Sequence, residues 1–166
     1  MRNKQYTRYS LVFLKVNKMI FIRKLDKSDF NSWLDVYRYY AEHYQTEFTD
    51  DGVATTWDWL MDTQHPLTGI VAESSGELIG LAHFRAMPSP LRGVNLGFLD
   101  DLVVKPQERG SNAARLLLDE LKSIGKKEKW AKIRWITRDD NYRARSLYDK
   151  VATKTNWTMY EMETNV

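Results

Sequence analysis

"LVVKPQERGSNAARLLLDEL", residues 102–121, is the stretch that decides the fold. A short apolar run typical of a strand ends at Pro106, small residues follow Arg109, and leucines then recur on one face of a helix. Amide groups at the start of a helix lack intrahelical partners, and the helix dipole favours negative charge there. The stretch therefore predicts either an anion-binding turn, with pyrophosphate as the natural ligand, or a plain connector.

Composition and charge narrow the class of protein. The chain has 166 residues, 43% of them hydrophobic and 28% charged, which predicts one globular domain with its own core. The net charge of +3 is too small to indicate a nucleic-acid-binding protein. The absence of cysteine excludes disulfides and a cysteine nucleophile, and the three histidines have no metal-ligand spacing, so we expect no metal.

We expect no targeting segment in the N-terminal part. Residues 1–18 contain an apolar run, "LVFL", that is too short for a signal peptide and ends at Lys15. We therefore interpret residues 1–18 as an extension and residues 19–166 as the single domain. No segment approaches the length of a membrane span, so we expect a cytoplasmic protein with no membrane partner.

The periodicity of apolar residues predicts the order of the elements. Strands are expected at 19–25, 67–74, 77–87, 96–105, 131–137 and 155–163, and helices at 26–44, 50–62, after Pro106 and at 141–151. Gly125 is the expected end of the helix that follows Pro106. This order predicts an α/β (α+β) fold with a mixed, largely antiparallel central sheet flanked by helices.

Three motifs resemble the GNAT superfamily of N-acetyltransferases. The opening stretch is similar to its acetyl-CoA-binding motif, a strand, then V-x-P-x-x-R-G-x-G-x-G/A, then a leucine-rich helix, and it matches at Val104, Pro106, Arg109, Gly110 and Ala114. "DDNYRARSLYDKV", 139–151, resembles the family's N-x-x-A-x-x-L-Y-x-K segment and matches at Asn141, Ala144, Leu147, Tyr148 and Lys150. "FLDDLVV", 98–104, resembles a strand of the histone/polyamine and spermidine/spermine acetyltransferase branch. The chain departs from the pattern at Asn112, where glycine is usual, and at Ala152 and Thr153, which replace a Gly-Phe pair.

The resemblance implies the activity and the cofactor-binding residues. It implies a GNAT-like fold and transfer of an acetyl group from acetyl-CoA directly to a primary amine in a ternary complex, which the lack of cysteine suits. Cofactor contacts are implied at the end of the strand, along the loop and on the last helix, where Asn141 bonds the pantetheine arm or only orders the helix start. The implied residues are Leu102, Val103, Val104, Arg109, Gly110, Ser111, Asn112, Ala113, Ala114, Arg115, Asn141, Tyr148 and Lys150, with the Val103 amide as the candidate oxyanion donor.

The candidate catalytic groups follow from the chemistry that acetyl transfer requires. The amine must lose a proton and the leaving thiolate must gain one. Asp100 and Asp101 interrupt an apolar strand, and simple alternation sends their side chains to opposite faces. The resemblance implies that Asp100 is the base, directly or through water, and that Tyr148 is the acid. The alternatives are structural carboxylates and a packed tyrosine.

The acceptor is the least specified part of the reaction. Tyr37, Tyr40 and Tyr44 recur on one face of the first long helix, either as core or as the wall of an acceptor pocket that suits a cationic amine. His83 is a structural histidine or faces the same cleft. We expect a small cationic amine, a polyamine or a lysine-like acceptor, and a possible homodimer. The alternative is a non-catalytic protein of the same fold that binds CoA as a sensor or scaffold.

Overall fold

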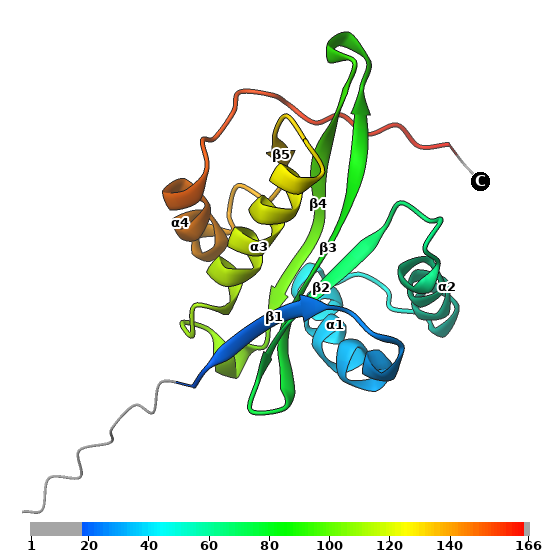
Figure 1. The fold of residues 1–166 in the computed structure, drawn as a ribbon, viewed down its shortest axis with the longest axis vertical. Coiled ribbons are helices and arrows are strands. Elements are labelled where there is room, and N and C mark those ends of the chain that lie inside the picture. Colours follow the sequence, from blue (N-terminus) through cyan, green and yellow to red (C-terminus); the bar gives the residue numbers. More distant parts are fainter. Residues whose placement is uncertain (1–17, 165–166) are drawn as a thin grey trace, which may run out of the picture.

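The computed structural model describes residues 18–164 (Figure 1). The predicted extension at 1–18 therefore lies outside the described residues, except for Lys18. The regular elements are β1 (Ile20–Lys24), α1 (Phe30–Tyr44), α2 (Asp50–Met61), β2 (Thr68–Ser74), β3 (Glu77–Ser89), β4 (Val94–Val104), α3 (Ala113–Lys127), β5 (Ile133–Arg134) and α4 (Tyr142–Val151).

The sheet confirms the predicted fold class. Its strand order is β1-β2-β3-β4-β5, and every pair is antiparallel except the parallel pair β4–β5. Helices cover both faces (Figure 1). One core layer joins α1 and α2 to the sheet through Trp33, Val36 and Leu81, and the other joins α3 through Leu117 and Leu121. Among residues 18–164, no helix is both long and apolar enough to cross a bilayer.

Two irregularities of β4 position the functional site. In the described part of the chain, β4 pairs with β5 at Gly97 and Phe98 alone. Trp130 packs against Gly97, where an added Cβ would lie 2.3 Å from the indole ring. Beyond Phe98, β4 stays paired with β3 but no longer with β5, and a gap opens between β4 and β5. A bulge then leaves Asp100 without a partner in β3, since His83 pairs with Asp101 and Phe84 pairs with Leu99. Such a bulge re-aims side chains and interrupts the simple alternation expected for Asp100 and Asp101.

Two sequence predictions about the second half of the chain are wrong in part. Gly125 does not end α3, which continues to Lys127. It is instead a buried helix position where a Cβ would lie 3.2 Å from Ile133 and 3.3 Å from Trp130. The strand expected at 131–137 is shorter in the structure: it consists of Ile133–Arg134, which pair with Gly97 and Phe98 of β4.

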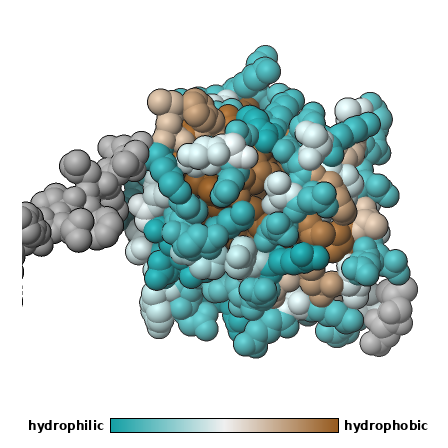
Figure 2. Space-filling view, turned by 90° about the horizontal axis from the view of Figure 1, so that it is seen from below, coloured by the Kyte–Doolittle hydropathy of each residue, from teal (hydrophilic) through white to brown (hydrophobic). Residues whose placement is uncertain are grey.

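The last predicted strand does not form. Residues 153–164 make no strand, although their sequence alternates as a strand would. Figure 1 shows this segment leaving α4 and crossing past the β3–β4 hairpin. The face in Figure 2 is mainly polar, with hydrophobic areas between the polar residues and at its edges.

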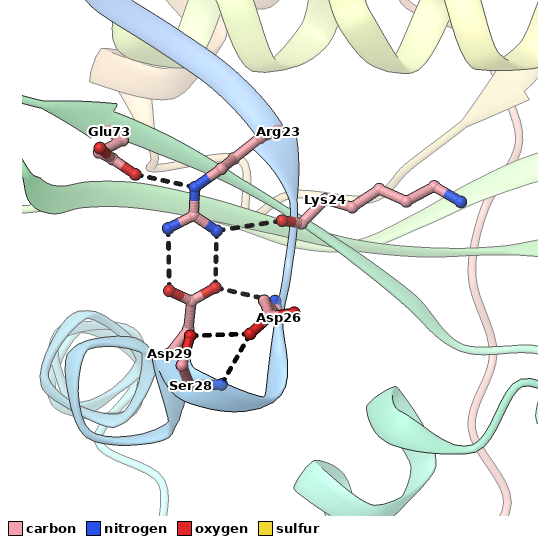
Figure 3. Close-up of polar contacts among 6 residues, drawn as sticks. All are labelled: Arg23, Lys24, Asp26, Ser28, Asp29 and Glu73. Carbon is pink, nitrogen blue, oxygen red and sulfur yellow. Dashed lines mark hydrogen bonds and ion pairs between the residues drawn. The ribbon is translucent and has the colours of Figure 1, made fainter.

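An ion-pair network fastens the first strand to the start of α1 (Figure 3). Arg23 on β1 makes two hydrogen bonds to Asp29, at 2.7 and 2.9 Å, and a third to Glu73 on β2 at 2.8 Å. Asp29 also accepts the Asp26 amide at 2.8 Å. The bonds from Arg23 are the largest influence on the Asp29 carboxyl and lower its pKa, although burial acts in the opposite direction.

Replacing Arg23 with methionine is expected to lower the free energy of unfolding by about 2 kcal/mol at neutral pH, because Asp29 keeps its charge but loses its partner. The lowered pKa of Asp29 means that the pair stabilises the fold above the ordinary aspartate pKa and ceases to do so as pH falls through the folded-state value. The difference between variant and wild type should therefore shrink below about pH 4. Urea unfolding of both proteins at several pH values measures this difference in the free energy of unfolding. Arg38→Met, in an exposed pair with Asp35 at 3.5 Å, is the control and should change stability by less than about 0.5 kcal/mol.

Candidate active site

The gap between β4 and β5 opens into a cavity of about 480 Å³, which we call the strand-gap cavity. It collects most of the predicted cofactor and catalytic residues from β4, the loop before α3, α3 and α4. Those present are Asp100, Leu102, Val103, Val104, Arg109, Gly110, Asn112, Ala113, Ala114, Arg115, Asn141 and Tyr148. Ser111, Lys150, Asp101 and His83 do not line it.

The backbone of β4 presents alternate amides to this cavity. The Lys105 amide bonds the Ile79 carbonyl, and Val103 pairs with Leu81 two residues earlier, so the same ladder directs the Val103 amide toward β3. The amides of Leu102 and Val104 point the other way, into the gap. The geometry therefore does not favour Val103 as oxyanion donor, since its amide belongs to the sheet.

The loop before α3 has the backbone form that an anion site requires. Gly110 and Asn112 both have positive φ, 86° and 77°, and α3 begins directly afterwards. Asparagine tolerates this left-handed conformation, so the usual glycine can be replaced here without changing the loop. The buried Ser111 hydroxyl has no hydrogen-bond partner within residues 18–164, and a Cβ on Gly110 would meet nothing within 4 Å. The positive φ values and the helix start fit a phosphate group held by backbone amides.

Helix α4 supplies Tyr148 to the cavity. Burial raises the pKa of its hydroxyl to about 12, so this tyrosine keeps its proton at neutral pH. Asn141 is the N-cap of α4: its side chain accepts the Ala144 amide at 3.3 Å and donates to Thr137 at 3.2 Å. It thus orders the helix start, one of its two predicted roles. Lys150 is exposed near the end of α4, away from the cavity.

A second cavity, of about 560 Å³, lies between α1, the α1–α2 connection and α2, and we call it the aromatic cavity. The three tyrosines of α1 line it, together with Phe48. Tyr40 and Tyr44 also line the strand-gap cavity, so the two cavities share a wall. Burial, with the nearby Asp101 charge, raises the pKa of Tyr37 and of Tyr40, which both remain neutral donors.

Asp101 is held in a buried hydrogen-bonded chain. Its Oδ2 atom lies 2.8 Å from His83 Nδ1 and accepts the Tyr37 hydroxyl at 3.1 Å. Trp33 donates its indole N–H to His83 Nε2 at 2.9 Å, which assigns the remaining ring hydrogen to Nδ1 and directs it at Asp101. Burial alone would raise the pKa of Asp101, but the bonds from His83 and the tyrosines lower it. His83 is therefore the structural histidine of the two predicted alternatives.

Asp100, unlike Asp101, has a buried carboxylate oxygen without a hydrogen-bond partner among the described residues, and a raised pKa. Its Oδ1 accepts Arg85 Nε at 3.2 Å, whereas its buried Oδ2 has no hydrogen-bond partner in the described part of the chain. Burial raises the pKa of this carboxyl above its usual value, opposed by Arg85 and assisted by the neighbouring Asp101 charge. An unpartnered carboxylate oxygen with a raised pKa beside a cavity has the properties of a proton acceptor.

Several residues of the site escaped the sequence analysis. Glu47, Phe48 and Arg138 line the aromatic cavity but lie in connections, where no periodicity marks a side chain as functional. Trp33 donates a hydrogen bond to His83, and Arg85 donates one to Asp100. These contacts join residues from different elements, so the sequence alone does not reveal them. The one available sequence indication was His83 itself, a polar residue in an apolar strand.

Comparison with known proteins places this geometry in a family. Residues 33–152 match the model described as the acetyltransferase (GNAT) family. The chain is 26% identical over 148 residues to the D-amino-acid N-acetyltransferase HPA3 of Saccharomyces cerevisiae, covering 88% of this chain and 92% of that protein.

Solved structures share the fold. A ribosomal-protein-alanine N-acetyltransferase from Brucella melitensis biovar Abortus 2308 superposes with a TM-score of 0.75 at 23% identity, covering 87% of this chain and 99% of that one. The aminoglycoside N-acetyltransferase AAC(6')-Iy, in complex with CoA, gives 0.75 at 15% identity, covering 92% and 99%. The acceptors named in these descriptions differ, so the shared fold does not specify the acceptor.

Proposed function

This chain belongs to the acetyltransferase (GNAT) family and is an acetyl-CoA-dependent N-acetyltransferase, and we propose that its acceptor is a small cationic amine. In this proposal the strand-gap cavity holds acetyl-CoA and the aromatic cavity holds the acceptor. The observation that carries the proposal is the shared wall of the two cavities, with Asp100 and Tyr148 lining the cofactor side. Transfer is then direct, in a ternary complex.

The residues that hold acetyl-CoA follow from the fit of the strand-gap cavity. The amide of Gly110 and the amides from Asn112 to Arg115 at the start of α3 would hold the pyrophosphate, and the amides of Leu102 and Val104 would bond the pantetheine arm. Bound acetyl-CoA supplies the activated acetyl thioester. Among residues 18–164, no cluster of three or more His, Asp or Glu side chains is arranged to hold a metal ion.

The two proton transfers are assigned to Asp100 and Tyr148. Asp100 is the better base, because its buried Oδ2 has no hydrogen-bond partner in the described part of the chain, whereas the Oδ2 of Asp101 is bonded to His83 and Tyr37. Asp101 instead keeps a fixed negative charge that favours an ammonium group nearby. Tyr148 lines the same cavity and is protonated at neutral pH, and in this proposal it donates a proton to the leaving thiolate.

A cationic acceptor is supported by the walls of the aromatic cavity. Tyr37, Tyr40, Tyr44 and Phe48 present aromatic rings, which attract cations, and Glu47 adds a negative charge. Arg138 is the single cation in the same lining and is an observation in favour of a carboxylate-bearing acceptor instead. HPA3, the yeast relative, is named for D-amino acids, which carry such a carboxylate.

Thiol release from acetyl-CoA with a panel of amines decides between these acceptors. We expect kcat/KM for spermidine to exceed that for D-alanine and glycine, and Glu47→Gln to raise KM for spermidine about tenfold with kcat nearly unchanged, as for the loss of one charge-assisted contact. Glu42→Gln, an exposed residue of α1 outside both cavities, is the matched control. A preference for D-alanine that Arg138→Gln abolishes would contradict the cationic acceptor and favour an amino acid.

A further inference from the structure

An ion pair joins the start of the first strand to the loop that leads into α3. Lys18 Nζ lies 3.2 Å from Glu108 Oε1, although 90 positions separate the two residues in the sequence. Glu108 ends the short turn Pro106–Glu108 and lines the strand-gap cavity, as Gly110 does. Figure 1 shows the start of β1 beside this loop. The last residue of the predicted extension therefore contacts a residue in the wall of the proposed cofactor site.

The position of Lys18 is set by β1. The Ser74 hydroxyl donates a hydrogen bond to the Met19 carbonyl at 3.1 Å, and Ile20 pairs with Ser74 in the sheet. Ile20 also packs against the core cluster that contains the leucines of α3. The backbone beside Lys18 is thus fixed to the same core as the helix, and its ammonium group approaches the loop from a defined place.

The Glu108 carboxylate lies near backbone groups that attract negative charge. The first backbone bond of α3 runs from the Leu116 amide to the Asn112 carbonyl at 3.0 Å, so the amides before Leu116 have no partner in the helix. The Asn112 side chain makes no capping bond to them. Carboxylates are stabilised at a helix start of this kind. A glutamate in the same cavity wall therefore competes with a pyrophosphate for these amides unless another group holds it.

We propose that Lys18 is a positioning residue for acetyl-CoA. By binding the Glu108 carboxylate, it keeps this negative charge away from the amides at the start of α3, which then remain available to the pyrophosphate. Without the ammonium group, Glu108 caps α3 itself and opposes binding of the cofactor. The inference rests on the proposed placement of acetyl-CoA in the strand-gap cavity.

The pair is better suited to controlling Glu108 than to stabilising the fold. The Lys18 side chain is 56% exposed, and an ion pair at such a position contributes little to the free energy of unfolding. Lys18 does not line the strand-gap cavity, whereas Glu108 does, so the lysine acts through the carboxylate. Of the two arginines that line this cavity beside α3, Arg115 is already bonded to Asp119 at 2.9 Å.

Calorimetric titration of CoA into the wild type and its variants tests the inference without an acceptor. We expect Lys18→Met to raise the Kd for CoA about three- to fivefold, the size of one carboxylate's interaction with a helix start. Glu108→Gln should bind CoA at least as tightly as the wild type, and the double variant Lys18→Met/Glu108→Gln should match Glu108→Gln. Lys24→Met, at an exposed lysine of β1 outside both cavities, is the control and should not change the Kd.

Two further measurements separate positioning from a structural role. The urea midpoint of ligand-free Lys18→Met should equal that of the wild type. In thiol-release assays its KM for acetyl-CoA should rise with the Kd, whereas kcat and the KM for spermidine should stay the same. Equal weakening of CoA binding by Lys18→Met and Glu108→Gln, with a lower urea midpoint for both, would instead assign the pair to the fold.

Gly110→Asp distinguishes failure of this inference from failure of the cofactor placement. It puts a carboxylate into the loop itself, where a Cβ meets nothing within 4 Å and where aspartate tolerates the positive φ. We expect it to raise the Kd for CoA more than Lys18→Met does. If Gly110→Asp left the Kd unchanged, acetyl-CoA would not lie in the strand-gap cavity. If Gly110→Asp weakened binding and Lys18→Met did not, the placement would stand and the role of Lys18 would be refuted.

Discussion

Tyr148→Phe is expected to lower kcat about a hundredfold or more, with little change in the KM for acetyl-CoA, because only the hydroxyl is lost. The ring stays packed against Trp135, at a centroid distance of 5.3 Å, so the shape of the cavity is preserved. The pKa of about 12 keeps this hydroxyl protonated across the assay range. In the wild type we therefore expect no loss of kcat from Tyr148 up to about pH 10.

The control for this variant lies on the same helix. Tyr142→Phe changes a 74% exposed tyrosine at the first position of α4 that does not line the cavity, and it should keep wild-type kcat. A Tyr148→Phe enzyme with unchanged kcat at every pH would remove this hydroxyl from the reaction. The proton for the thiolate would then have to come from water or from another group.

Asp100→Asn should have a comparable effect on kcat, about a hundredfold, together with a change in pH dependence. The base works only when it is deprotonated, and burial raises the pKa of Asp100. Wild-type kcat should therefore fall as pH drops through a value above that of a free aspartate, and this acid limb should be absent from the variant. Stopped assays of acetyl-spermidine from pH 5 to 9 measure both curves.

Two further variants separate catalysis from structure. Asp58→Asn, at an exposed position of α2, should leave the profile unchanged. Asp101→Asn should lower thermal stability, because His83 Nδ1 and the Tyr37 hydroxyl then share a neutral amide oxygen in place of a charged carboxylate acceptor. If Asp101→Asn rather than Asp100→Asn removed the acid limb, the roles of the two carboxylates would be reversed.

The sequence was most informative where local chemistry decides local structure. Pro106, Gly110 and the leucines of α3 form a turn and a helix for reasons contained in the stretch itself, and the predicted loop residues other than Ser111 line one cavity. The tyrosines of α1 share a face because helical spacing requires it. For the same reason the order of strands and helices was predictable up to α4.

Pairing between distant segments was not predictable. The bulge at Asp100 exists only in the register of β4 against β3, and the same register turns the Val103 amide away from the cavity. In the sequence, Gly125 indicates a helix end. In the structure it is a helix position that packs against Trp130 and Ile133, and only the fold brings these two residues to it. The alternating residues of 155–163 indicated a strand, but a strand needs a partner that this single chain does not provide.

Initial rates of thiol release, with acetyl-CoA and spermidine both varied, test the central claim most directly. If both substrates occupy adjoining cavities at once, the double-reciprocal lines of the wild type intersect. The Asp100→Asn and Tyr148→Phe variants should each have a lower maximal rate and still give intersecting lines. Parallel lines would indicate an acetylated enzyme intermediate. They would contradict direct transfer between the strand-gap and aromatic cavities.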